Sequence, residues 1–488
     1  MARIQGRVQE TVPPLTSPPL VIDLDGTLLR SDLLMETAMA FVRSKPLEVL
    51  SVLGWLFKGK AALKEGLALA TEIDVSVLPY DSQIIELILA EKATGRIIIL
   101  ATASHVSLAE RIAEHLQLFD LVFASTTHRN LSGNSKRDLL VAHYGEGGFD
   151  YVGNSKDDLP IWKVSRQAYV VNPDPGVESR VKAMARVEPT LRTHTASLRD
   201  WRKAMRMHQW LKNALIFVPL LASHRLAQLE LMRDGVFAFL CFGVCASSVY
   251  ILNDLLDLGD DRHHKIKRNR PFASGRLSIK AGLILVPSLL LTAFGSALLL
   301  LPWQFSAVMA AYYGLTLAYS LQLKRLMAWD VIVLAMLYTA RIIAGVAAFN
   351  LTLTFWILAF SMFIFLSLAM VKRYAELHDA RTREVNTVAR GRGYYPGDLD
   401  MIASLGASSG YLAVMVLALY IQDANTTSLY VTPHVIWLAC PLLLFWVTRV
   451  WMLTHRGQMN EDPVVFAIRD RTSQLIGAVF LLMFWIAA

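Results

Sequence analysis

The chain has 488 residues, enough for two or three domains, and its formal net charge is +8 at pH 7. Hydrophobic residues make up 54% of the chain, more than a soluble globular protein normally contains, and most of this excess lies in residues 205–488. The positive charge of a membrane protein mainly reflects its topology, so nucleic acid is not expected as a partner.

Residues 18–185 are predicted to form an α/β domain that follows a flexible tail over residues 1–17. An apolar strand delivers Asp23 and Asp25 into a turn closed by Gly26 and Thr27. Two carboxylates in this position suit phosphoryl transfer, because one can attack phosphorus while the other handles the proton of the leaving group.

Residues 33–90 have a helical pattern and are predicted to form a small cap on this domain. The run 47–57, LEVLSVLGWLF, is apolar for a cap of a soluble domain. We expect it to be a buried cap helix, and docking on a membrane face is the alternative.

The DxDGT string at residues 23–27 resembles the first motif of the haloacid dehalogenase (HAD) phosphohydrolases, a family with a Rossmann-like α/β fold. Three further motifs follow in the family's order: a strand, IIILATAS, that ends at Thr102, then Lys136 after a turn, then DYVGNSKDDLPIW with Asp157 and Asp158. The resemblance implies that the Thr102 hydroxyl holds phosphoryl oxygens and that Lys136 neutralises the growing charge.

The same resemblance implies a magnesium site in this domain. Its ligands would be Asp23, the carbonyl of Asp25 and Asp158, with Asp157 as a substitute. The family's fourth motif usually reads GDxxxD, and Asn154 stands where its first aspartate is expected. This departure leaves two readings open, a weaker metal site or a domain without catalytic activity.

Residues 186–205 are polar and basic and are predicted to link the α/β domain to an all-α membrane bundle over residues 206–488. The bundle is expected to have about nine transmembrane helices. With the N-terminus inside, the internal loops hold 17 Lys and Arg residues and the external loops hold two, which predicts a cytoplasmic α/β domain. The apolar segments lie near 209–224, 233–252, 279–301, 304–321, 330–349, 354–371, 400–421, 433–453 and 472–487.

A highly polar stretch, NDLLDLGDDRHHKIKRNRP over residues 253–271, interrupts the membrane half. Asp254, Asp257 and Asp261 are spaced three and four residues apart, so on a helix they share one face. Three such carboxylates repel one another unless a cation lies among them, and the usual cation is Mg²⁺ carrying a substrate diphosphate. A charged loop without function is the alternative, and the sorting of acids and bases disfavours it. Bases that could bind further phosphate oxygens follow, namely His264, Lys267 and Arg270.

Other polar side chains recur at the predicted cytoplasmic helix ends. Ionisable groups within a membrane bundle are costly, so they usually line a polar cavity. Arg341 lies well inside an apolar segment, whereas Lys324 and Arg373 could equally be anchors at the membrane surface. The candidate substrate-binding residues of these clusters are Gln209, Lys212, Asn213, Tyr319, Lys324, Arg341, Lys372, Arg373 and Glu376.

The NDxxDxxxD pattern, with its basic run ending in Arg-Pro, resembles the UbiA superfamily of intramembrane prenyltransferases over roughly residues 200–488. Ordinary members carry a second acidic motif after the sixth helix, which holds a second Mg²⁺ against a prenyl diphosphate. Here that loop begins KRYAELHDARTRE and is mainly basic, and its Glu376 and Asp379 have the wrong spacing. The strings DRHHKIKRNRP, QWLKN and KRYAEL instead resemble the decaprenyl-phosphate phosphoribosyltransferase branch, with Lys265 where the branch has proline.

This resemblance implies transfer of 5-phosphoribose from phosphoribosyl diphosphate (PRPP) to a polyprenyl phosphate. Lys267 and Arg270 would grip phosphates of the ribose substrate, Lys372 and Arg373 would position the lipid phosphate, and the HAD domain would remove the 5-phosphate. Asn253, Asp254, Asp257 and Asp261 would bind Mg²⁺–PRPP.

Two alternatives to this function stay open. One is an aromatic prenyltransferase of the 4-hydroxybenzoate type that uses a polyprenyl diphosphate. The other is a lipid-phosphate-binding scaffold or transporter without enzymatic activity. In the leading reading the cofactor is Mg²⁺ in both domains, the partners are the two substrates and the bilayer, and an oligomer is compatible with the sequence. The expected location is the inner (plasma) membrane, crossed several times, with both active sites cytoplasmic.

Overall fold

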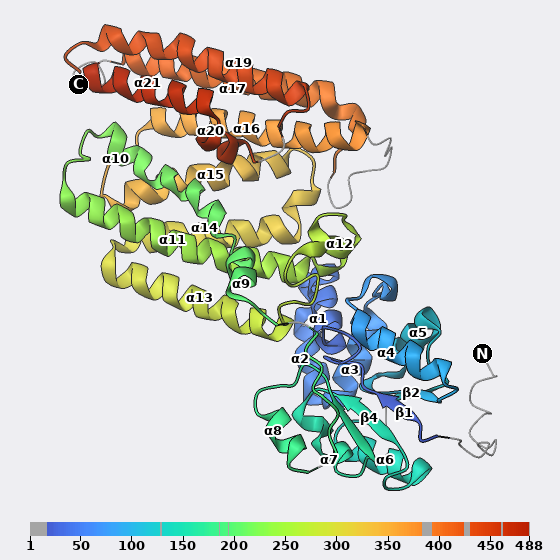
Figure 1. Cartoon of the computed structure of the whole chain (residues 1–488). Coiled ribbons are helices and arrows are strands. Elements are labelled where there is room, and N and C mark those ends of the chain that lie inside the picture. The colour runs from blue at the N-terminus through green and yellow to red at the C-terminus, as the bar shows by residue number, and fades with distance from the viewer. Residues whose placement is uncertain are drawn as a thin grey trace. The chain divides into compact units, whose positions relative to one another are not determined.

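The computed structural model describes residues 17–126, 129–184, 186–193, 195–382, 393–423, 430–459 and 462–487 (Figure 1). The expected tail over residues 1–17 lies outside the described residues except for Ser17. Contacts divide the chain into two compact units. The first consists of Met1–Ala204 and Ile251–Ile284, and the second of Met205–Tyr250 and Leu285–Ala488. The acidic stretch after residue 253 therefore belongs to the same unit as the N-terminal domain.

A five-stranded parallel sheet with the order β3-β2-β1-β4-β5 forms the centre of the first unit. The central strand β1 is fully buried, and its Leu20 is paired with Ile98 on one side and Asp150 on the other. Parallel strands end at one edge of a sheet, so residues that follow β1, β2 and β4 meet there. The α/β class is confirmed. The strands are β1 (Leu20–Ile22), β2 (Ile98–His105), β3 (Leu121–Ser125), β4 (Asp150–Gly153) and β5 (Gln167–Val170).

Helices bury both faces of this sheet. Successive side chains of β1 point to opposite faces, so Leu20 and Ile22 pack in one apolar cluster and Val21 in another. A parallel sheet covered in this way explains why its strands read as continuous apolar runs. The helices of the N-terminal part are α1 (Leu33–Ser44), α2 (Val49–Phe57), α3 (Lys60–Ala70), α4 (Ser82–Ala93), α5 (Val106–Leu116), α6 (Asn134–Tyr144), α7 (Leu159–Trp162), α8 (Val177–Lys182) and α9 (Leu198–Ala204).

The prediction of a buried cap helix over residues 47–57 is wrong, because α2 contains no buried residue. Leu50 is 77% exposed and Phe57 is 91% exposed. Trp55 is half-buried and its ring meets that of Phe41, with 5.3 Å between ring centroids. A sequence run shows that side chains are apolar but not what covers them.

Six helices in the described chain are long and apolar enough to cross a membrane. The predicted count of nine spans is not confirmed. Three predicted segments are helical but are not among these six helices. They are the segment near 209–224, which forms η4 and α10, the segment near 304–321, which forms α14, and the segment near 472–487, which forms α21. The six spans are Leu229–Leu256, Ile279–Leu300, Trp329–Ala348, Phe355–Asp379, Pro396–Gln422 and His434–His455.

Helices that lie largely in the second unit form an all-α arrangement around two apolar clusters. At Gly345 a Cβ atom would lie 2.0 Å from the carbonyl oxygen of Ile216, so only glycine lets η4 come this close to α15. The elements are η4 (Met207–Phe217), α10 (Val218–Ala222), α11 (Leu229–Leu256), α13 (Ile279–Leu300), α14 (Trp303–Leu321), α15 (Trp329–Ala348), α16 (Phe355–Thr382), α17 (Leu399–Gln422), η8 (Pro433–Leu438), α19 (Ala439–His455), α20 (Pro463–Arg469) and α21 (Arg471–Ala487).

The exposure of α2 gives a stability prediction. Phe41→Ala removes a fully buried ring and should lower the free energy of unfolding of the first unit by about 3–5 kcal/mol. Leu50→Ala should change it by no more than about 0.5 kcal/mol, because that side chain is largely exposed. Hydrogen exchange of β1 and β2 amides in detergent-solubilised protein measures both effects. An equally large loss for Leu50→Ala would mean that α2 is covered.

Candidate functional site

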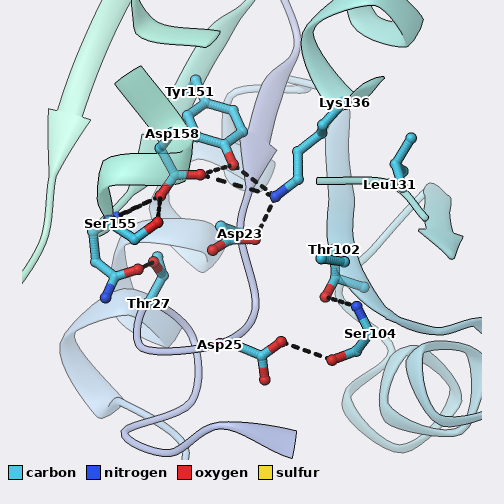
Figure 2. Close-up of polar contacts among 12 residues, drawn as sticks. Asp23, Asp25, Thr27, Thr102, Ser104, Leu131, Lys136, Tyr151, Ser155 and Asp158 are labelled. Atoms are coloured by element: carbon cyan, nitrogen blue, oxygen red, sulfur yellow. Dashed lines mark hydrogen bonds and ion pairs between the residues drawn. The ribbon is translucent and has the colours of Figure 1, made fainter. Parts of the chain in front are cut away.

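Figure 2 shows the polar site at the carboxyl end of the sheet in the first unit. Asp23 follows β1 directly, and its backbone N–H donates to the carbonyl of Val152 in β4 at 2.9 Å. Lys136, from α6, donates to Oδ1 of Asp23 at 2.7 Å. Both side chains are buried, which places a paired acid and base at the position predicted for the nucleophile.

Lys136 also connects Asp23 to Asp158. Its ammonium donates to the Tyr151 hydroxyl at 3.0 Å, and that hydroxyl donates to Oδ1 of Asp158 at 2.7 Å (Figure 2). Oδ2 of Asp158 accepts from the backbone N–H groups of Asn154 and Ser155. Asp158 is therefore fixed, whereas Asp157 on the same turn is exposed.

Asp25 is held from two sides. Its Oδ1 accepts from the backbone N–H of Leu33 at 2.8 Å, and its Oδ2 accepts from the Ser104 hydroxyl at 2.7 Å. The fully buried Thr102 lies on the same strand as Ser104, and its hydroxyl oxygen accepts from the Ser104 N–H at 3.0 Å. All four predicted catalytic residues of this domain thus gather at one edge of the sheet.

The acids at this edge have altered proton affinity. Burial raises the pKa of Asp23 to about 7, opposed by the Lys136 ammonium and reinforced by Asp158. Burial and then the Asp32 carboxylate raise the pKa of Asp25 to about 6. Burial alone would lower the pKa of Lys136, but the Asp23 and Asp158 carboxylates outweigh it and the pKa is raised. A further cation near Asp23 would favour its ionised form.

The residues here fit a magnesium ion by the chemistry of their donor atoms. Carboxylate and carbonyl oxygens from Asp23, Asp25 and Asp158 are hard ligands of the kind that Mg²⁺ prefers. Asn154 contributes an amide in place of a charge, and its Oδ1 accepts from the Thr27 hydroxyl at 3.4 Å. A Cβ at Gly26 would lie 2.3 Å from Nδ2 of Asn154, so this turn and the amide are packed together.

Sequence reasoning missed three residues of this site. Ser104 and Tyr151 orient the predicted acids, and Lys64 of α3 donates to the carbonyl of Ala103 at 2.6 Å. Ser104 follows Thr102 by two residues on one strand, which was a usable signal. Lys64 lines a small pocket at this edge whose other lining residues are Leu33, Leu34, Thr37, Ser104, His105 and Leu108.

The acidic stretch lies at the end of α11 and in the short helix α12 (Leu258–His263). Nη1 of Arg270 donates to Asp254 at 3.2 Å and to both oxygens of Asp261, at 2.9 and 2.7 Å. One nitrogen therefore carries positive charge between two of the three predicted carboxylates. Burial raises the pKa of Asp261 to about 6, although Arg270 opposes this.

Asp257, the third acid, accepts from Arg43 of α1, and so does Asp260. No three acidic, His or Cys side chains in the described chain form a ready metal cluster. The oxygen donors nevertheless fit Mg²⁺ chemically, and Arg270 already stands as a cation between Asp254 and Asp261. Asn253 lies in α11 beside these acids, while His264 and Lys267 are exposed.

The second unit contains a separate polar cluster. Lys212 of η4 donates to Oδ2 of Asp462 at 2.6 Å, and Lys372 of α16 lies 3.5 Å from the same oxygen. Tyr338 donates to both oxygens of Asp462. Sequence reasoning missed Asp462, which caps α20 by accepting from Val464 N–H; an aspartate before proline at a helix start was the available signal.

Arg341 is buried in the middle of α15 and only 4% exposed. Its guanidinium donates to Oδ1 of Asn213 at 3.1 Å, to the Tyr312 hydroxyl at 3.1 Å and to the carbonyl of Leu337 at 2.5 Å. Rings of Tyr312 and Tyr338 also lie against it. Within the described residues these hydrogen-bond partners are all neutral, which suits a cation that receives an anionic ligand.

Arg373 lies in a different environment from Lys372. It is 1% exposed and pairs with Asp330 at 2.8 Å and with Glu376. Tyr319 donates to the same Asp330 at 2.8 Å. The predicted residues Arg373, Glu376 and Tyr319 thus form one ion-pair network around Asp330. The remaining predicted residues, Gln209 in η4 and Lys324 in the turn η6 (Leu323–Arg325), are partly exposed.

Two relatives are similar to this chain over different lengths. A protein of Sinorhizobium fredii described as uncharacterized protein y4nM is 37% identical over 471 residues, which cover 96% of this chain and 91% of that protein. Decaprenyl-phosphate phosphoribosyltransferase of Mycobacterium tuberculosis is 30% identical over 284 residues, covering 57% of this chain and 91% of that enzyme.

Solved structures resemble each half of the chain. A UbiA homolog from Archaeoglobus fulgidus bound to DMAPP and Mg²⁺ covers 59% of this chain and 98% of its own, with 14% identity and a TM-score of 0.45. A HAD family hydrolase from Salmonella enterica covers 36% of this chain and 70% of its own, with 14% identity and a TM-score of 0.28. The family described as the UbiA prenyltransferase family matches residues 216–486, more than half of the chain. The protein therefore belongs to the UbiA prenyltransferase family and is an integral membrane protein.

Proposed function

We propose that the membrane domain transfers 5-phosphoribose from PRPP to a polyprenyl phosphate. The observation that carries this proposal is Arg341, a buried guanidinium whose described hydrogen-bond partners are neutral. Such a cation favours an anionic substrate, because an anion would compensate its buried charge. The relative named decaprenyl-phosphate phosphoribosyltransferase supports the choice of donor and acceptor.

In the proposed reaction, an oxygen of the lipid phosphate attacks the anomeric carbon of PRPP. The bond from that carbon to the diphosphate oxygen breaks, and diphosphate leaves with the bonding electrons. Asn253, Asp254, Asp257 and Asp261 would hold Mg²⁺, which would neutralise charge on the diphosphate. Arg270, which contacts Asp254 and Asp261, would turn its remaining donors to phosphate oxygens.

Lys212, Lys372 and Arg341 are the residues proposed to bind the lipid phosphate. Two of them converge on Asp462, so the cluster keeps a net positive charge. Arg373 is the weaker candidate, since Asp330 and Glu376 already neutralise it. The sequence from residue 372 was expected to be a loop, but residues 372–382 form the last turns of α16. The mainly basic sequence that begins there supports an acceptor whose phosphate binds to cations without a second metal.

We also propose that the HAD-like domain removes the 5-phosphate from the lipid-linked product. Asp23 would attack phosphorus, and Asp25 would protonate the departing ribose oxygen and then activate water for hydrolysis of the aspartyl phosphate. Lys136 would hold the charge that develops on the phosphoryl oxygens. The excess of Lys and Arg in the predicted internal loops supports a cytoplasmic position for both active sites.

The first prediction from this proposal concerns the acids. Asp254→Ala and Asp257→Ala should each lower transfer of label from PRPP to the lipid fraction by roughly 100-fold or more, because each removes a metal-binding carboxylate. Asp260→Ala is the control, since its side chain is 54% exposed and lies off the shared face. Transfer of a prenyl group to 4-hydroxybenzoate, with no activity toward PRPP, would instead favour an aromatic prenyltransferase.

Arg341→Gln tests the lipid-phosphate site. Losing a buried charged donor should raise the KM for polyprenyl phosphate by about ten-fold or more while the KM for PRPP stays near its original value. Arg449→Gln serves as the control, because Arg449 is already satisfied by Asp470 at 2.7 and 3.1 Å. An unchanged KM for the lipid in folded Arg341→Gln protein would remove Arg341 from this site.

Asp23→Asn should leave transfer intact and cause 5-phosphorylated lipid-ribose to accumulate. The substitution removes the attacking carboxylate and keeps a side chain of the same shape beside Lys136. Mass spectrometry of the lipid products should show a difference of one phosphate group between wild type and variant. Identical dephosphorylated products from both would mean that the HAD-like domain acts on another substrate or, given Asn154, on none.

A further inference from the structure

Helix α1 begins at the phosphatase-like site. The backbone N–H of its first residue, Leu33, donates to Oδ1 of Asp25, the proposed acid–base group, at 2.8 Å. Asp32 caps the helix by accepting from Leu34 and Met35. Any displacement of α1 along its axis would therefore change the hydrogen bond that orients Asp25.

The same helix lies beside α12 and contacts the acidic stretch (Figure 1). Glu36 accepts from Arg262 through both carboxylate oxygens, at 2.6 and 3.0 Å, and Nε of Arg262 donates to the carbonyl of Ala273 at 2.9 Å. Both charged side chains of this pair are buried, 4% and 5% exposed. Breaking such a pair is strongly unfavourable, because it leaves a buried charge without a partner.

Arg43, two turns along α1 from Glu36, makes the second attachment. Its guanidinium donates to Asp257, to Asp260 and, at 3.0 Å, to the carbonyl of Leu256 at the end of α11. Residues seven apart share one face of a helix, so α1 presents an acid to Arg262 and a base to Asp257 on the same side. The contact is complementary in charge along its length.

We propose that α1 couples the two active sites, and this inference rests on the proposed binding of a metal–diphosphate donor at Asp257. When the donor site is empty, Asp257 pairs with Arg43. This pair fixes the position of α1 and so keeps the hydrogen bond from Leu33 to Asp25 in place. A donor that draws Asp257 to its metal removes one of the contacts of Arg43, so α1 is held less firmly to the acidic stretch. The phosphatase is then active when the donor site is empty, which is the state that follows transfer and loss of diphosphate.

The test uses full-length protein in detergent with Mg²⁺ and inorganic pyrophosphate as the probe for the donor diphosphate. Hydrolysis of p-nitrophenyl phosphate reports the phosphatase, and hydrogen exchange of peptides covering residues 33–44 and 251–263 reports α1 and the acidic stretch. In wild type, the probe should lower hydrolysis by about five-fold or more and speed exchange in residues 33–44.

Arg43→Gln should abolish both responses to the probe, and Arg43→Lys should restore part of them. Lys45→Gln is the matched control, because it also removes one positive charge, two residues after Arg43, and the pair that Lys45 forms with Glu48 is exposed. Pyrophosphate that acts by occupying the phosphatase site itself would still inhibit Arg43→Gln, and that result would overturn the coupling.

The exchange measurements separate failure of the coupling from failure of the proposed function. Protection of residues 251–263 by the probe, with no change in residues 33–44, would reject the coupling and keep the donor site. A wild-type protein in which neither peptide responds would reject both. Absence of hydrolysis, with faster exchange in residues 33–44 that depends on Arg43, would reject the phosphatase activity and keep the mechanical link.

Discussion

Burial of charged side chains is the physical constraint on which both units depend. A charge removed from water needs a partner, and in the described chain the partners come from distant parts of the sequence. Lys136 meets Asp23, Arg262 meets Glu36, and Arg373 meets Asp330. Because each pair is specific in geometry, it fixes the position of the elements that carry its two residues.

The positions of the candidate side chains could be predicted where the signal is local. The strand before Asp23 and the helical spacing of Asp254, Asp257 and Asp261 are short patterns in the sequence. The structure brings the predicted catalytic residues of the α/β domain together at one edge of the sheet. The ion-pair partners of charged side chains could not be predicted where the two residues are far apart in the sequence. Asp462 meets Lys212 across 250 positions, and no periodicity in a single sequence reports such a contact.

Two predictions failed or were not confirmed for related reasons. Hydropathy reports the chemical character of a segment, but burial depends on what packs against it. The residues of α2 are apolar and yet exposed, and three of nine apolar segments are not among the helices long and apolar enough to cross a membrane. Asn154 is a change that hydropathy does not report at all. It directly follows β4 and places a neutral amide where the family's motif has a carboxylate.

The discontinuous make-up of the first unit has a consequence for biosynthesis. Glu36 and its partner Arg262 are separated by 226 positions, and α11 must be synthesised between them. The nascent N-terminal domain therefore leaves the ribosome with Glu36 and Arg43 still hydrated, and it can reach its final form only after residues up to Ile284 have emerged. Synthesis of the apolar helix α11 thus precedes the last folding step of a domain whose five strands are encoded before residue 171.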